Sequence, residues 1–242
     1  MKNFLKIMIT VSLCISSSFA APQKGTMKDP RDGKTYKTVK IGDQVWMAEN
    51  LKYSMKGTLS DSRYGVFYQY KNALKACPAG WHLPNTEDWK NFILSVKTEK
   101  MDEFGAELQK QMGTNEPIDL FSLLPKDDLN QILSTLSWRD LSSRQWSKGI
   151  ENRNEIGFDM EPSGYFFLTD NGYVQGKGIV IGTYNFMENG FAAFWGADVA
   201  ESKVISFLAG VLSRSPQLQA QVMLYHADKN SEAFPIRCVK NK

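Results

Sequence analysis

Two histidines and three cysteines are the residues of this chain best suited to acid–base, nucleophilic or metal chemistry. They are His82, His226, Cys14, Cys77 and Cys238. We interpret His82 as a residue that makes a structural hydrogen bond and His226 as a surface turn residue. Three cysteines cannot build a Cys₄ zinc site, and a Cys₂His₂ site would use nearly every candidate ligand. A Ser-His-Asp triad stays open, because spatial neighbours are invisible in a sequence, but no Gly-x-Ser-x-Gly elbow is present. We therefore predict no metal site and no resident cofactor, and we assign no catalytic residue.

Aromatic side chains offer a second kind of chemistry, because their faces stack on sugar rings while neighbouring polar groups hold the hydroxyls. The candidates for such ligand contacts are Trp138, Trp146, Tyr165, Tyr184, Phe186 and Trp195. Core packing remains the alternative interpretation of each ring.

Composition places the chain among ordinary soluble globular proteins. Its 242 residues are 42% hydrophobic and 23% charged, with a net charge of +3. These values argue against a disordered chain, a polytopic membrane protein and a polybasic nucleic-acid binder.

Residues 1–20 have the layout of a secretory signal peptide. Lys2 and Lys6 precede the apolar run Ile7–Ile15, which is too short to span a bilayer as a helix. Ser18 and Ala20 are small residues at the positions that a cleavage site requires. We expect an exported protein, located in the periplasm, on the cell surface or outside the cell, with no transmembrane segment in its mature part. Removing two lysines and no acids lowers the net charge to +1, so we expect no nucleic-acid partner.

Export leaves two cysteines in an oxidising compartment, where a disulfide between Cys77 and Cys238 is the default. Two unpaired buried thiols are the alternative.

The pattern of the mature chain predicts one domain over residues 29–242, preceded by a polar leader at 21–28. Alternating β-formers at 35–41 and the apolar residues 45–47 predict a hairpin. Helices are expected over 69–76 and over 84–99, where Asn85 or Thr86 can cap the start. The polar, helix-prone stretch from about 97 to 150 predicts a helical insertion. The last eighty residues contain runs of β-forming residues separated by turn residues. This pattern predicts strands, with a closing strand at 233–239.

Several segments resemble the Fibrobacter succinogenes major paralogous domain family. They are Asp32–Gly42, Gln44–Leu51, Ala76–Pro84, Gly157–Phe158, Pro162–Gly164 and Phe234–Lys240. The resemblance spans most of residues 29–240 and covers 97–150 poorly. Family members often carry another cysteine pair before the first helix, which this chain lacks.

That family is similar to the C-type lectin-like fold. The resemblance therefore implies an α+β fold in which two helices of the N-terminal half pack on a twisted, mainly antiparallel sheet. It also implies that the first-helix cysteine pairs with the last-strand cysteine, which Cys77 and Cys238 would provide.

Sugar-binding members of that fold typically hold calcium with a Glu-Pro-Asn or Gln-Pro-Asp loop. Glu161-Pro162-Ser163 matches it only in part, so Glu161 is a candidate ligand residue and calcium is not favoured. We expect a binding module without catalytic activity, for a polysaccharide or a cell-surface protein. An exported hydrolase and a structural envelope protein are the alternatives.

Overall fold

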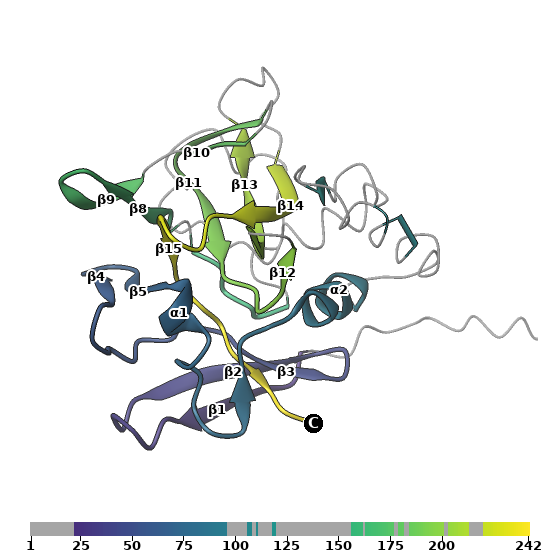
Figure 1. Ribbon diagram of the computed structural model, residues 1–242. Helices are drawn as coiled ribbons and strands as arrows, with labels where there is room; N and C mark the ends of the chain where they lie inside the picture. Colours follow the sequence, from purple (N-terminus) through teal and green to yellow (C-terminus); the bar gives the residue numbers. More distant parts are fainter. Residues whose placement is uncertain are drawn as a thin grey trace, which may run out of the picture.

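The computed structural model describes residues 22–95, 106–107, 110, 118–119, 156–161, 163–176, 179–181, 184–200, 203–212 and 220–242. These residues form mainly antiparallel sheets with short helices (Figure 1). The α+β class expected from the sequence is therefore confirmed, in a form dominated by sheet. Residues 1–20 and most of 97–150 lie outside the described residues.

The first sheet joins the N-terminal hairpin to the last strand of the chain. Its order is β1 (Lys24–Lys28), β2 (Thr35–Ile41), β3 (Gln44–Met47), β16 (Val239–Lys240) and β6 (Trp81–His82). Trp46 of β3 lies opposite Val39 of β2 and opposite Val239 of β16. The predicted hairpin is confirmed, and the C-terminus lies beside it (Figure 1).

Two further sheets come mainly from the second half of the chain. One follows the order β10 (Ile179–Ile181), β11 (Tyr184–Phe194), β13 (Lys203–Leu212), β14 (Ala220–Ala227) and β7 (Ile118–Asp119), with β12 (Val199–Ala200) also paired to β13. The other follows the order β4 (Leu59–Asp61), β5 (Gly65–Gln69), β15 (Glu232–Phe234), β8 (Tyr165–Thr169) and β9 (Gly172–Gly176).

Three differences from the sequence expectations concern strands. The polar leader 21–28 contains β1, an edge strand whose mostly exposed side chains give no alternating signal because its backbone alone pairs with β2. Within the helix-prone 97–150 stretch, residues 106, 107 and 110 are helical, but Ile118–Asp119 pairs with β14 as β7. The expected closing strand 233–239 is divided between β15 and β16.

The helix predicted over 84–99 begins as its sequence indicates. It is α2 (Thr86–Leu94), and residues beyond 95 fall outside the described part. The Asn85 side chain accepts a hydrogen bond from Asp88 N, and the Asp88 side chain accepts one from Asn85 N, which together form a capping box. The segment expected over 69–76 is shorter, with α1 (Tyr70–Ala73) followed by turns.

An aromatic cluster forms the core between α2 and the sheets. Trp89 stacks on Phe207 with ring centroids 4.4 Å apart and lies 4.8 Å from Trp46. Phe92 and Phe158 close the cluster, with their ring centroids 4.7 Å apart. These rings have no exposed surface, so the aromatic face of α2 packs in the core.

A disulfide joins Cys77 to Cys238 across 161 residues, with their Cα atoms 5.8 Å apart. It ties the turn after α1 to the segment between β15 and β16. The predicted pairing is confirmed. Across the described part of the chain, no helix has the length and apolar character needed to cross a membrane.

Candidate functional site

A polar cleft opens between the loop after β3, the turn between β4 and β5, and the loop that precedes β8. Its volume is about 190 Å³. The cleft is lined by Lys37, Ala48, Glu49, Asn50, Lys52, Arg63, Tyr64, Asp159, Glu161 and Arg237. Seven of these ten side chains carry a formal charge, so the cleft suits a ligand rich in hydrogen-bonding groups.

Arg237 is the buried cation of this cleft, with only 1% of its surface exposed. Its Nε donates to Oδ1 of Asn50 at 3.0 Å, and its Nη2 donates to the carbonyl of Asp159 at 2.6 Å. Its Nη1 donates to the carbonyl of Phe158. A planar guanidinium has N–H donors on three nitrogens in fixed directions, so it can reach three separate acceptors. The three donors of a lysine ammonium all belong to one nitrogen.

The surroundings of Arg237 are both aromatic and polar. Its guanidinium lies 4.6 Å from the ring centroid of Phe158 and 5.3 Å from that of Phe194. Burial lowers the pKa of Arg237 to about 10, while the carboxylates of Asp159, Glu161 and Glu49 act in the opposite direction. Arg237 therefore stays protonated at neutral pH.

The loop at Asp159 has an unusual backbone conformation for a residue with a side chain. Asp159 has φ of +46°, in the left-handed region that aspartate tolerates better than most residues. Because Arg237 donates to the carbonyls of both Phe158 and Asp159, it holds this turn from inside the protein. Glu161, two residues further, is thereby carried to the cleft.

Glu49 lies on the opposite wall of the cleft. One carboxylate oxygen, Oε2, accepts a hydrogen bond of 2.7 Å from the backbone N–H of Lys37. The other, Oε1, lies 3.9 Å from Nζ of Lys52. The wall therefore presents two lysines around a carboxylate whose position is fixed by the β2 backbone.

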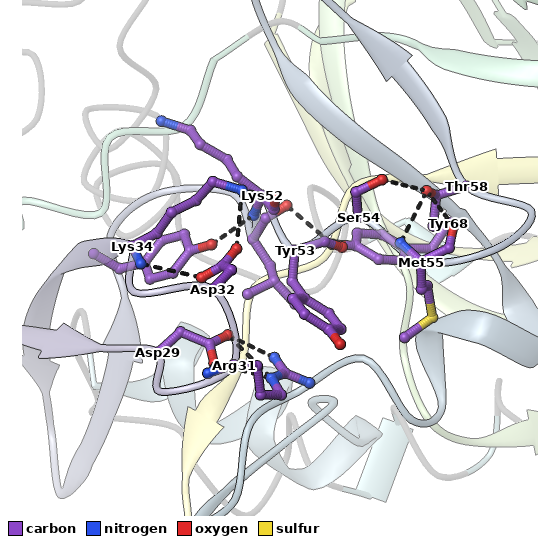
Figure 2. A network of polar contacts seen from close by, with 12 residues as sticks. Asp29, Arg31, Asp32, Lys34, Lys52, Tyr53, Ser54, Met55, Thr58 and Tyr68 are labelled. Carbon is purple, nitrogen blue, oxygen red and sulfur yellow. Dashed lines mark hydrogen bonds and ion pairs between the residues drawn. The ribbon is translucent and has the colours of Figure 1, made fainter.

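A network of polar contacts fixes the backbone of Lys52. Its N–H donates to Oη of Tyr36 at 3.0 Å, and its carbonyl accepts from Nζ of Lys34 at 2.7 Å. Figure 2 shows that the Lys52 side chain itself extends away from these contacts. Burial raises the pKa of Tyr36 to about 12, so its hydroxyl remains protonated at neutral pH.

The same network anchors the segment that follows Lys52. Tyr68 donates from Oη to the carbonyl of Tyr53 at 2.7 Å, and Arg31 lies 3.8 Å from the centroid of the Tyr53 ring (Figure 2). Arg31 in turn pairs with the buried carboxylate of Asp29, and this hydrogen bonding lowers the pKa of Asp29. The cleft wall thus rests on a bonded framework.

Of the predicted contact residues, the structure brings Glu161 to the cleft. Trp195 has no exposed surface, and its Nε1 donates to the carbonyl of Tyr68 at 2.6 Å. Tyr165 is half-buried and packs against Phe191 and Phe234. Trp195 therefore has the core role that was the alternative interpretation, whereas Tyr165 lies partly exposed against the core.

The remaining predicted residues are not tested by the structure. Tyr184 and Phe186 lie in β11, but their side chains fall outside the described part. Trp138 and Trp146 lie outside the described residues altogether.

The two histidines have structural settings. His82 lies between Oδ2 of Asp88, 2.9 Å from its Nε2, and Oδ1 of Asn241, 2.7 Å from its Nδ1. The expected hydrogen-bonding role of His82 is confirmed. The suggestion that His226 is a surface turn residue is wrong, because it is buried within β14 opposite Ile205. Among the residues that the structure describes, no group of three or more His, Cys, Asp or Glu side chains could hold a metal ion.

Sequence analysis did not single out Arg237, Asn50 or Asp159 as site residues. A signal for Arg237 was present, because it is the one charged residue between the apolar Phe234 and Val239 of the closing segment. A charge in such a run needs buried partners. No comparable local signal marks Asn50 or Asp159, whose importance depends on contacts with distant parts of the chain.

Comparison with known proteins adds one match. The sequence model described as the Fibrobacter succinogenes major domain matches residues 39–240. No curated protein and no solved structure matches the chain. The matched range includes the cleft-lining residues from Ala48 to Arg237 and both cysteines of the disulfide.

Proposed function

The chain belongs to the Fibrobacter succinogenes major domain family, and from that premise we propose that it is an exported binding module that recognises glycan in the polar cleft beside Arg237. The observation that carries this proposal is the cleft itself. Its charged and amide side chains are suited to sugar hydroxyls, which both donate and accept hydrogen bonds. Tyr64 adds an aromatic residue to the lining, with the guanidinium of Arg63 5.1 Å from its ring centroid.

The size of the cleft favours a small unit of a larger ligand. Its volume of about 190 Å³ lies below the range of roughly 300 to 1,000 Å³ that is usual for drug-sized ligands. A single sugar residue of a polysaccharide suits such a space, whereas a folded protein partner needs a much broader surface.

Preorganisation of the cleft supports binding. Arg237 joins two walls of the cleft through Asn50 and the Asp159 loop, and Tyr36 with Lys34 holds the backbone of Lys52. A site whose groups are already fixed loses less conformational entropy when a ligand enters.

We also propose that the protein has a C-type lectin-like fold and is exported. The order of hairpin, short helix, α2 and antiparallel strands supports this fold, as does the bridge from the end of the first helix to the last strands. The disulfide supports an oxidising compartment, in agreement with residues 1–20 as a signal peptide. Mass spectrometry of the exported protein should find Ala21 as its first residue.

Binding is favoured over hydrolysis by the setting of His82. Both of its ring nitrogens lie within hydrogen-bond distance of side-chain oxygens, those of Asp88 and Asn241. A general base that activates a nucleophile needs one nitrogen directed at that nucleophile.

A glycan array probed with the mature protein tests the proposal, with and without a calcium chelator. We expect glycan binding that the chelator leaves unchanged and that Glu161→Gln weakens, because an amide oxygen is a poorer acceptor than a carboxylate. Asp170→Asn, which removes a carboxylate from an exposed turn, is the matched control and should bind normally. Failure to bind any glycan under both conditions would contradict the proposed function.

A further inference from the structure

We infer that the glycan unit recognised by the cleft carries a carboxylate, so that the ligand is an acidic saccharide built from uronic acid residues. This inference rests on the proposed function and specifies its ligand class. Its basis is the distribution of charge among the side chains that line the cleft.

The first observation is that the buried Arg237 has no carboxylate close to it. Arg237 is buried, yet within the described part of the chain no carboxylate lies within 4.0 Å of its guanidinium nitrogens. Its hydrogen-bond partners are two carbonyls and one amide oxygen, which are neutral. A buried cation is costly unless it is compensated, and a carboxylate in the cleft would supply part of that compensation.

The second observation is that two lysine ammonium groups of the cleft make no short contact with a carboxylate. Lys37 is exposed, and across the described residues its ammonium has neither a hydrogen bond nor an ion pair. The Lys52 ammonium lies 3.9 Å from Glu49, beyond hydrogen-bond distance, although its backbone is held on both sides. Two lysine ammonium groups can therefore turn towards an anion without breaking a short contact.

The third observation is that the two glutamates of the lining differ in their contacts. Glu49 already accepts a hydrogen bond from the Lys37 backbone, so it is partly satisfied inside the protein. The Glu161 carboxylate makes no hydrogen bond or ion pair with the described residues. An ionised carboxylate can only accept hydrogen bonds, and sugar hydroxyls donate them.

A ligand with hydroxyls and a carboxylate satisfies both signs at once. The hydroxyls would donate to Glu161, and the carboxylate would lie near Lys37 and Lys52 in the field of Arg237. An acidic peptide offers the carboxylate but few hydroxyls, and it would find little apolar surface, since Ala48 and Tyr64 are the nonpolar members of the lining. A neutral sugar would offer no counter-charge to the ammonium of Lys37, which has no ion pair with the described residues.

The test uses matched pairs of oligosaccharides of galacturonate, glucuronate and mannuronate, each with its carboxyl-reduced neutral form, and poly-glutamate as the acidic peptide. Calorimetric titration of the mature protein should show at least about tenfold tighter binding of one acidic form than of its neutral partner, since one charge-assisted contact contributes on the order of 1.4 kcal/mol or more. Added salt should weaken this binding.

A double variant and a control complete the design. Lys37→Met with Lys52→Met should remove the preference for the acidic form and keep the unfolding temperature. Lys40→Met, an exposed lysine on the same strand that does not line the cleft, should retain the preference. Equal affinity for acidic and neutral forms would overturn the inference and leave the proposed function standing. Binding of poly-glutamate alone would replace the saccharide with a protein partner, and binding of no saccharide would count against both proposals.

Discussion

Arg237 and Asn50 are 187 residues apart in the sequence, and their side chains meet in a 3.0 Å hydrogen bond inside the protein. Asn50 also donates from Nδ2 to the carbonyl of Tyr64 at 3.5 Å. The pair thus joins the closing segment, the loop after β3 and the turn before β5. All three elements contribute residues to the lining of the cleft, so the contact that stabilises the fold also shapes the site.

Replacing Arg237 by lysine should lower the free energy of unfolding by about 3 kcal/mol, because a buried carbonyl or amide oxygen left without its donor costs about 1 to 3 kcal/mol. Urea unfolding measures the loss. Arg63→Lys makes the same exchange at an exposed position of the cleft and should change stability by less than about 0.5 kcal/mol. Equal effects of the two variants would show that the buried guanidinium does not organise this region.

Removing the disulfide with Cys77→Ala and Cys238→Ala should lower stability by about 5 kcal/mol in the chain-entropy model, because the bridge closes a loop of 161 residues. Such a loss approaches the whole stability of many domains. Thermal unfolding with and without a reductant checks the prediction. An unchanged unfolding temperature in the reduced protein would contradict it.

Asp88 should matter more than its capping partner Asn85. Asn85→Ala removes one cap contact of α2 and should cost about 1 kcal/mol. Asp88→Ala also removes the contacts of its carboxylate with His82 and with Nε2 of Gln44, so it should cost about 2 kcal/mol or more. Urea unfolding of both variants ranks them, and a larger effect of Asn85→Ala would show that the link to His82 contributes nothing.

The pH dependence of stability should contain a contribution from Glu232. Its buried carboxylate accepts hydrogen bonds from Oη of Tyr225 and from the backbone N–H of Asp228, and burial raises its pKa above the usual 4.5. The folded protein then binds this proton more tightly than the unfolded chain does. The free energy of unfolding therefore falls as the pH rises from about 4.5 through the raised pKa.

Glu232→Gln removes this titration. The difference in unfolding free energy between the native protein and the variant, measured in urea from pH 4 to pH 7, should shift in favour of the variant as the pH rises. Other titrating groups are shared and cancel in the difference. A difference that is constant across this range would show that Glu232 does not titrate differently on folding.

The local signals of the sequence predicted local structure well. The N-terminal hairpin, the start of α2 and the pairing of Cys77 with Cys238 were all confirmed. Alternation, capping and cysteine placement depend on neighbours in the chain or on export, which a sequence displays. The edge strand β1 was missed because its pairing uses backbone groups and leaves no side-chain pattern.

The candidate site was far less predictable. Trp195, chosen for its aromatic face, is in the core, and the cleft depends on Arg237, Asn50 and Asp159 instead. Their roles come from contacts between segments separated by about 80 to 190 residues, which no periodicity reveals. Glu161 was identified through a resemblance to sugar-binding loops, and it reaches the cleft through a turn held by Arg237.

The most direct test of the central claim is to map ligand binding on the protein by NMR. The ¹⁵N-labelled mature protein is titrated with the tightest oligosaccharide from the glycan array. Binding in the cleft should shift the amide signals of Glu49, Asn50, Arg63, Tyr64 and Glu161, and Glu161→Gln should reduce those shifts. Shifts confined to α2 or to the β8–β9 hairpin, with the cleft signals unchanged, would contradict the assignment of the cleft as the binding site.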